Sequence, residues 1–326
     1  MDQIVLEQPG HFTQRDATPP VPDVGESLVR IRRVGVCGTD YHAFEGQQPY
    51  FTYPRILGHE LSGEVASVPE NSRGIHRGDR VAVEPYLNCG ECGACRAGKR
   101  NCCESLRVLG VHTDGGMQAL LAVPVHRLHK SARLTLDQLA LVEPLGIGAH
   151  AVVRSGLRKG ESVLVIGAGP IGLAVSQFAV AAGGRVRVLE INAARREFAA
   201  RFGVEVTDRA DERLADVVFD ATGNAKSMEQ SLGHVAFGGR LVFVGLVQSN
   251  VALDDALFHR REITLLASRN SVDDFPRIIR LIEQRKIDTA LWITHRLSLA
   301  EVPHRFPSLP RETNCIKAMI EIPGAD

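Results

Sequence analysis

The sequence contains no apolar run that approaches the ~20 residues needed to span a bilayer. Its first residues lack the positive charge and apolar core of a signal peptide, so we expect a cytoplasmic protein. Net charge is also absent, because 38 Lys and Arg balance 38 Asp and Glu. A protein that binds nucleic acid normally shows a basic excess. We therefore expect neither a membrane nor nucleic acid as a partner.

The 326 residues are 44% hydrophobic, which excludes a disordered chain, and they exceed what one ordinary core supports. Residues 1–144 form short alternating runs broken by Gly and Pro, which predicts a β-rich domain. Residues 145–267 alternate buried strands such as Ser162–Ile166 with helical stretches. This alternation predicts an α/β fold with a doubly wound parallel sheet. Residues 268–326 end in a strand-like segment at Cys315–Ile322 and are expected to return to the first domain.

Five of the seven cysteines cluster within fifteen residues, which indicates metal binding better than a disulfide framework. Four of them follow the spacing C-x2-C-x2-C-x7-C, namely Cys89, Cys92, Cys95 and Cys103. Four thiolates on a Gly-rich lobe (residues 86–104) predict a closed, structural zinc site. A ferredoxin-type cluster would need a shorter last spacing and a proline after it, where this chain has Glu104. Cys102 is an alternative to Cys103.

A second potential metal site comes from residues far apart in the sequence. A catalytic zinc takes three protein ligands and keeps one position open for water or substrate. Cys37 and His59 are the predicted thiolate and imidazole ligands, and either Glu60 or Glu143 supplies the third. Asp40 is expected to accept a hydrogen bond that orients one of the ligands.

A Gly-rich motif follows the strand Ser162–Ile166 and begins a helix, as a dinucleotide site requires. Its defining residues are Gly167, Gly169, Pro170, Ile171 and Gly172. Glu190, eighteen residues beyond Gly172, ends the next strand. A carboxylate there accepts hydrogen bonds from ribose hydroxyls and repels a 2′-phosphate, so NAD is favoured over NADP. Arg195 and Arg196 would soften this preference if they faced the cofactor.

Together these motifs resemble the zinc-dependent medium-chain alcohol dehydrogenases, in the sorbitol and threonine dehydrogenase branch. The likeness includes Glu143-Pro144 and the strand end Asp220–Gly223, whose Thr222 is expected at the cofactor. A closer likeness, to bacterial L-galactonate-type sugar-acid dehydrogenases, depends on the segments Tyr53–Glu60, Gly110–His112, Asp114–Gly116 and Ser268–Asn270.

The resemblance implies a GroES-like catalytic domain, a Rossmann domain and an active site in the cleft between them. It also implies that Thr39 and His42 carry the substrate proton out of the site, and that Arg269 lies near Glu143 or the substrate. Gln48 and His112 are further polar candidates for substrate contacts.

Two departures from the family pattern concern the cofactor domain. The chain is short between Gly203 and Val217, where relatives fit a longer helix, and Glu190 replaces the more usual Asp. The family also implies a homodimer or homotetramer. The segment Val251–Ser268 is a candidate for pairing sheet edges between subunits, or else it is an ordinary closing strand.

We therefore expect an enzyme that transfers hydride from a secondary alcohol of a polyol or sugar acid, L-galactonate-like, to NAD. One catalytic and one structural zinc per chain are the expected metals. Threonine or a simple secondary alcohol is an alternative substrate, and a non-catalytic NAD-binding sensor is an alternative function. A zinc-free reductase of the same architecture would lack Cys37, His59 and the cysteine lobe. Zero net charge disfavours the lobe as a nucleic-acid module.

Overall fold

The computed structural model describes residues 1–49 and 51–323. It divides into two compact units. The first contains Met1–Glu143, Phe275–Glu283 and Thr289–Asp326, and the second contains Pro144–Asp274 and Gln284–Asp288. Among the described residues, none of the helices has the length and apolar character needed to cross a membrane.

The first unit is built on a mainly antiparallel sheet with the order β16-β17-β3-β4-β5-β9, to which β8 adds by pairing with β3. Its central strand β3 buries Ser27, Val29 and Ile31 and turns the residues between them outward, as a period of two requires. The strands are β3 (Glu26–Gly35), β4 (Glu60–Ser67), β5 (Arg80–Val83), β8 (Leu120–Pro124), β9 (Leu128–Lys130), β16 (Ile293–Ser298) and β17 (Lys317–Glu321).

Smaller elements surround this sheet. Two small antiparallel sheets are formed by β1 (Asp2–Gln8) with β2 (His11–Asp16), and by β6 (Tyr86–Leu87) with β7 (Arg107–Val108), which enclose the lobe cysteines between them in sequence. The helices are α1 (Gly38–Phe44), α2 (Gly93–Arg96), α3 (Leu136–Ala140), α9 (Phe275–Glu283) and α10 (Val302–Arg305). Short 3-10 turns lie at Arg100–Cys102, Val125–Arg127, Leu299–Glu301 and Phe306–Arg311.

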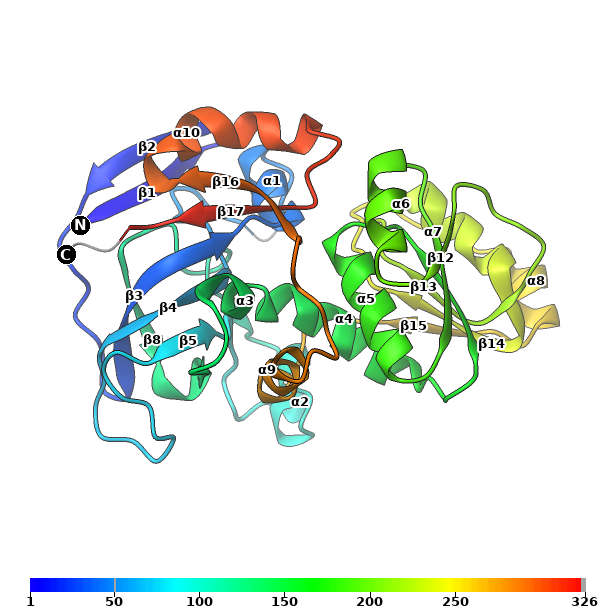
Figure 1. Ribbon diagram of the computed structural model, residues 1–326, viewed down its shortest axis with the longest axis horizontal. Coiled ribbons are helices and arrows are strands. Elements are labelled where there is room, and N and C mark those ends of the chain that lie inside the picture. Colours follow the sequence, from blue (N-terminus) through cyan, green and yellow to red (C-terminus); the bar gives the residue numbers. More distant parts are fainter. Residues whose placement is uncertain (50, 324–326) are drawn as a thin grey trace. The chain divides into compact units, whose positions relative to one another are not determined.

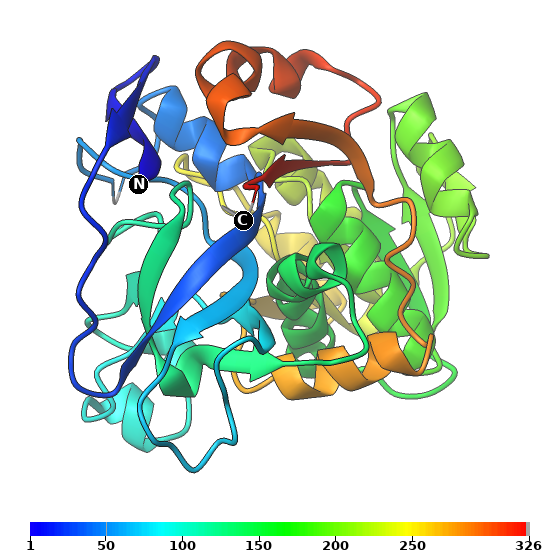
Figure 2. The same ribbon diagram turned by 60° about the vertical axis from the view of Figure 1, so that its left-hand side comes forward.

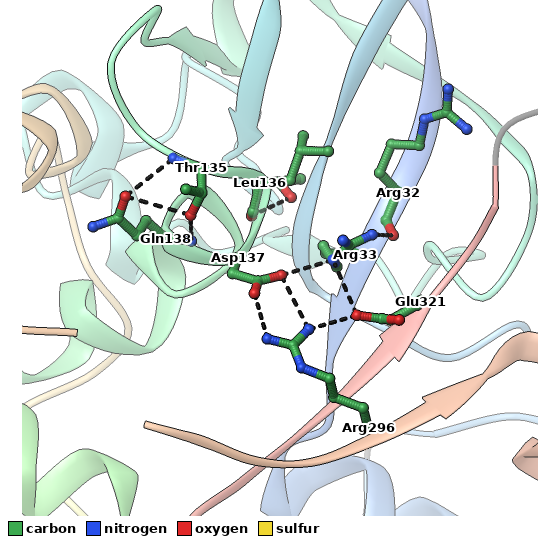
Figure 3. A network of polar contacts seen from close by, with 9 residues as sticks. Arg32, Arg33, Thr135, Leu136, Asp137, Gln138, Arg296 and Glu321 are labelled. Carbon is green, nitrogen blue, oxygen red and sulfur yellow. Dashed lines mark hydrogen bonds and ion pairs between the residues drawn. The ribbon is translucent and has the colours of Figure 1, made fainter. Parts of the chain in front are cut away.

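The C-terminal segment joins the first unit through strand pairing. β17 runs antiparallel to β3, with Met319 opposite Gly35, and β16 runs parallel to β17 (Figure 2). A charged network supports this return (Figure 3). Asp137 on α3 accepts from Arg33 at 2.7 Å and from Arg296 at 2.5 Å, and Arg296 also contacts Glu321 at 2.5 Å. The network therefore connects α3, β3, β16 and β17.

The second unit contains a six-stranded parallel sheet with the order β12-β11-β10-β13-β14-β15, the doubly wound arrangement that binds dinucleotides. This confirms the predicted α/β fold class. The strands are β10 (Ser162–Ile166), β11 (Arg185–Leu189), β12 (Glu205–Thr207), β13 (Ala215–Asp220), β14 (Val235–Phe243) and β15 (Thr264–Ala267). The helices are α4 (Val142–Ser155), which starts in the first unit, α5 (Pro170–Ala181), α6 (Ala193–Ala200), α7 (Ala225–Ser231) and α8 (Asp255–Arg260), with a 3-10 turn at Leu232–His234.

Helices cover both faces of this sheet. α5 and α6 lie on one face and α7 and α8 on the other (Figure 1), as right-handed crossovers in opposite directions from the centre require. The shortened stretch before Val217 replaces a helix by a loop between β12 and β13. Arg213 holds that loop by pairing with Glu205 at 2.5 Å and with Asp211 at 2.6 Å.

The candidate pairing segment Val251–Ser268 is not a continuous strand. It contains α8 and then β15, so only Thr264–Ala267 offers a sheet edge. Residues 268–274 and 284–288 also differ from the expected return segment 268–326, because they lie in the second unit. At residues 284–288 the side chain of Gln177 bonds both backbone polar groups of Asp288, at 2.7 and 2.8 Å.

Candidate metal centres and dinucleotide site

Two strands of the first unit and the turn beside them bring Cys37, His59 and Glu60 together. Cys37 follows β3 and precedes α1, while His59 and Glu60 lie at the start of β4, where Glu60 pairs with Gly35. A Cβ on Gly35 would lie 2.1 Å from Glu60 Oε2, so only glycine leaves room for this carboxylate. One ligand atom from each of the three residues lies within 4.8 Å of the others. A thiol, an imidazole and a carboxylate form a donor set suited to zinc.

Asp40 contacts two members of this cluster, Cys37 and His59. Its Oδ2 accepts the Cys37 backbone N–H at 2.8 Å, and its Oδ1 lies 3.7 Å from His59 Nδ1. Nδ1 therefore faces Asp40 and leaves Nε2 for a metal. Burial opposes a charged imidazole, yet the negative charges of Asp40 and Cys37 raise the pKa of His59 well above its usual range. The groups around the imidazole therefore favour a positive charge at this position.

Lys317 is a member of this site that the sequence analysis missed. It is 2% exposed, and its ammonium donates to both Glu60 oxygens at 2.6 and 2.7 Å and to the Val36 carbonyl at 3.0 Å. These three acceptors use all three of its N–H donors. The available signal was its position as the only charged residue in the apolar run Ile316–Ile320.

Glu143 lies outside the group that Cys37, His59 and Glu60 form. It stands in the first turn of α4, is 5% exposed, and accepts a hydrogen bond from the Tyr86 hydroxyl. Burial raises the pKa of Glu143 to about 7. Of the two carboxylates that the sequence left open, the structure therefore puts Glu60 with the cysteine and the histidine.

The other predicted catalytic and substrate residues occupy more open positions. Thr39 and His42 lie three residues apart on α1, so they share a helix face, with Thr39 half-buried and His42 exposed. Gln48 is half-buried, whereas His112 Nδ1 accepts the Val108 N–H at 3.2 Å, which gives His112 a role within its own loop. Arg269 is exposed and follows β15 in the second unit.

The cysteine lobe brings four sulfur atoms within 4.8 Å of one another. They belong to Cys89, Cys92, Cys95 and Cys103. Cys102 is exposed and outside this group, whereas Cys103 is buried. Backbone N–H groups point at the sulfurs, as for Cys89 N–H to Cys103 Sγ at 3.3 Å. Such donors lower the pKa of Cys89 to about 6, whereas burial raises the pKa of Cys95 to about 11. The grouping of four sulfur atoms, rather than these pKa values, fits a closed four-coordinate zinc.

The Gly-rich loop between β10 and α5 requires glycine at two of its three glycine positions. A Cβ on Gly172 would lie 1.9 Å from the Gly167 carbonyl oxygen, and Gly167 itself has φ +95°. A Cβ on Gly169 would instead meet nothing within 4 Å. Gly167 and Gly172 therefore serve close packing, whereas Gly169, which precedes α5 with Pro170 and Ile171 in its first turn, leaves open space. This arrangement fits a pyrophosphate at the helix N-terminus.

Glu190 closes the loop from the end of β11. It is 7% exposed, and its carboxylate accepts the backbone N–H groups of Ala168 at 2.7 Å and Asn192 at 2.8 Å. Ile191 beside it is 85% exposed, which is unusual for an apolar side chain and suits a flat adenine ring. Glu190 is thus fixed beside the Gly-rich loop by contacts of both carboxylate oxygens.

Two of the remaining cofactor candidates, Thr222 and Arg196, have structural partners. Thr222, after β13, donates its hydroxyl to Asp220 at 2.6 Å and lies against Gly167. Arg196 donates to the carbonyls of Glu190 and Ile191 at 2.9 and 2.7 Å, so it is committed to the backbone. Arg195 is half-buried.

Family models match both halves of the chain. The alcohol dehydrogenase GroES-like domain matches residues 23–133, and the zinc-binding dehydrogenase domain matches residues 170–284. Two curated bacterial proteins are similar along nearly the whole chain. L-galactonate-5-dehydrogenase of Escherichia coli K12 is 39% identical over 94% of both chains, and 2-dehydro-3-deoxy-L-galactonate 5-dehydrogenase of Pseudoalteromonas atlantica is 35% identical over 92% of both.

Solved structures share the fold. A crystal structure described as a short chain alcohol dehydrogenase of E. coli CFT073, complexed with NADH, has a TM-score of 0.92 at 27% identity and covers 98% of this chain and 99% of its own. A zinc-binding dehydrogenase of Sinorhizobium meliloti 1021 bound to NADP has a TM-score of 0.92 at 30% identity over 98% of both. The chain belongs to the zinc-binding alcohol dehydrogenase family. It is an oxidoreductase that acts on CH–OH donors.

Proposed function

We propose that this enzyme oxidises a secondary hydroxyl of a sugar acid or related polyol and passes the hydride to NAD. The observation that supports this most is the grouping of Cys37, His59 and Glu60 within 4.8 Å, in a chain similar throughout to two galactonate-type dehydrogenases. Both of those relatives are named as acting at carbon 5 of an acid. A secondary hydroxyl on a carboxylate-bearing chain is therefore the proposed substrate.

Cys37, His59 and Glu60 would hold the catalytic zinc, and the four cysteines of the lobe would hold the structural one. When bound, the catalytic ion supplies Lewis acidity that lowers the pKa of the substrate hydroxyl. Asp40 would orient the His59 ring electrostatically, because its Oδ1 faces Nδ1 at 3.7 Å, a separation too long for the hydrogen bond that the sequence predicted. Lys317 balances the charge of Glu60, because its ammonium contacts both carboxylate oxygens.

Thr39 and His42 would move the proton. Thr39, half-buried in the first turn of α1, would accept the proton of the substrate hydroxyl while giving its own hydroxyl proton towards His42, which is one turn further along, exposed, and able to release a proton to water. Arg269 would bind the substrate carboxylate, because a guanidinium matches a carboxylate with two parallel hydrogen bonds.

A substrate panel with NAD tests this function. L-galactonate and related hydroxy acids should give a kcat/KM at least about tenfold above the matching hexitol, since a charged pair with Arg269 is worth roughly 1.5–3 kcal/mol. Formation of reduced dinucleotide is followed by absorbance. If threonine or a simple secondary alcohol were the best substrate, the sugar-acid proposal would be wrong. If no alcohol were oxidised, a non-catalytic NAD-binding role would replace it.

Glu190 predicts the choice of cofactor. Its fixed carboxylate would repel a 2′-phosphate by roughly 4 kcal/mol at ~4 Å and an effective dielectric of ~20. We expect kcat/KM for NAD to exceed that for NADP by at least about 100-fold, which leaves part of this repulsion to solvent screening. Steady-state kinetics with both cofactors measure the ratio.

The matched variant Glu190→Gln keeps size and removes charge. It should lower the NAD-to-NADP ratio by about tenfold or more, because the amide does not repel phosphate. An unchanged ratio, or a wild-type preference for NADP, would contradict the role of Glu190.

We also propose a cytoplasmic homodimer or homotetramer. All seven cysteines are free thiols, which suits a reducing compartment. β15 forms the outer edge of the parallel sheet, and its Leu265 and Leu266 are only half-buried. Pairing of this edge with the same edge of a second subunit would satisfy the open strand edge of β15 and would bury the two leucines.

A further inference from the structure

The segment Glu84–Asn88 runs from β5 to the first cysteine of the lobe, and its alternate side chains make buried polar contacts. Glu84 is 8% exposed and Tyr86 is 4% exposed. Cys89 follows directly, so the position of this segment determines where the cysteine lobe begins.

Asn88 and Glu84 anchor the segment through Arg127, which is 5% exposed. The guanidinium donates to the Glu84 carboxylate and to Asn88 Oδ1, and His129 Nε2 contacts the second Glu84 oxygen at 2.9 Å. Because a guanidinium has only donors, it must face the oxygen of the Asn88 amide. The amide nitrogen is thereby directed to Cys95 Sγ, at 3.4 Å. The lobe is thus fastened to the sheet at one of its metal-binding sulfurs.

Tyr86 connects the same lobe to Glu143. Its ring packs with Cys95, Cys103 and Leu106 in the small core of the lobe, and its backbone pairs with Val108. Its hydroxyl leaves that core and donates to Glu143 Oε1. One side chain therefore contacts the structural site with its ring and a buried carboxylate with its hydroxyl.

Glu143 is buried in the first turn of α4, and the charges of His59 and Glu60 act on its pKa in opposite directions, His59 lowering it and Glu60 raising it. We propose that Tyr86 is a positioning residue that transmits the geometry of the four-cysteine lobe to Glu143 beside the Cys37–His59–Glu60 site. This inference rests on the proposed function, because it requires a metal in each site. The lobe then does more than stabilise its own loop. It sets the carboxylate environment of the catalytic metal.

Tyr86→Phe removes only the hydroxyl and leaves the ring in the lobe core. The readout is the visible spectrum of an enzyme with cobalt in the catalytic site and zinc in the lobe, with metal content checked by native mass spectrometry. We expect Tyr86→Phe to keep both metals, to shift the cobalt bands and to lower kcat about tenfold, the usual scale for partners of metal-site groups.

A double-mutant cycle with Glu143→Gln separates positioning from general structural damage. If Tyr86 acts through Glu143, the double variant should match Glu143→Gln alone in spectrum and kcat. Loss of the lobe zinc in Cys103→Ser should shift the cobalt bands in the same direction as Tyr86→Phe. Should Cys103→Ser fail to fold, the cycle of Tyr86→Phe and Glu143→Gln still tests whether Tyr86 acts through Glu143.

Unchanged cobalt bands in Tyr86→Phe, or additive effects in the cycle, would overturn the coupling while leaving the proposed function intact. A wild-type enzyme whose catalytic site binds no cobalt would overturn both.

Discussion

Cys37→Ser is expected to lower kcat/KM by at least about 1000-fold, roughly 4 kcal/mol of transition-state stabilisation, because a serine hydroxyl replaces the thiolate ligand of the Lewis acid. The metal content should fall from about two ions per chain to about one, since the lobe keeps its own ion. Kinetics and elemental analysis of the same sample measure both effects.

Cys315→Ser is the matched control. Cys315 is the other cysteine outside the lobe, is half-buried and packs against the core of the first unit. It should retain both metals and full activity, with a stability loss of about 1 kcal/mol at most. A Cys37→Ser enzyme that keeps two metal ions per chain and wild-type turnover would contradict the assignment of Cys37 as a ligand of the catalytic metal.

The second large effect concerns the lobe, where two adjacent cysteines provide their own control. Cys103→Ser removes a buried sulfur from the four-atom group, whereas Cys102→Ser changes an exposed one outside it. We expect Cys103→Ser to lose the lobe metal and to lower Tm by about 4 °C. A loss of about 3 kcal/mol gives a shift of this size in a chain of 326 residues.

Cys102→Ser should keep two metals and shift Tm by less than about 2 °C, as expected for an exposed position. Differential scanning calorimetry with metal analysis compares the variants. The reverse order of effects, with Cys102→Ser losing the metal, would mean that the lobe uses the other cysteine.

Much of the fold could be predicted because the relevant signals are local. The buried runs at 162–166 and 185–189 match β10 and β11, and the Gly-rich turn lies directly before α5. The cysteine spacing also lies within one short segment. In each case the residues that act together are close in sequence.

The rest of the site depends on contacts between distant residues. Lys317 reaches Glu60 across 257 positions, and Tyr86 reaches Glu143 across 57. Neither pair has a local pattern that spacing could reveal. For the same reason the sequence left the third metal ligand open. Glu60 and Glu143 are both glutamates, and only the folded chain shows that Glu60 lies with Cys37 and His59.

The sequence is short between β12 and β13, which predicted that the helix found there in relatives is missing. The ion pairs that hold the loop in its place could not be predicted. Arg213 lies among exposed charges, and the sequence does not distinguish a paired arginine from a solvated one. The segment Val251–Ser268 was ambiguous for another reason. The segment contains a helix followed by a strand, so the spacing of its apolar residues changes along its length and matches neither the helical nor the strand period throughout.

The central claim is that a metal ion held by Cys37, His59 and Glu60 makes alcohol oxidation possible. The direct measurement removes metal with a chelator until the lobe ion alone stays bound, then titrates zinc back while following oxidation of the best sugar acid with NAD. Activity should vanish in the depleted enzyme and return linearly, reaching its maximum at about one added ion per chain. Full oxidation by the depleted enzyme would contradict the claim.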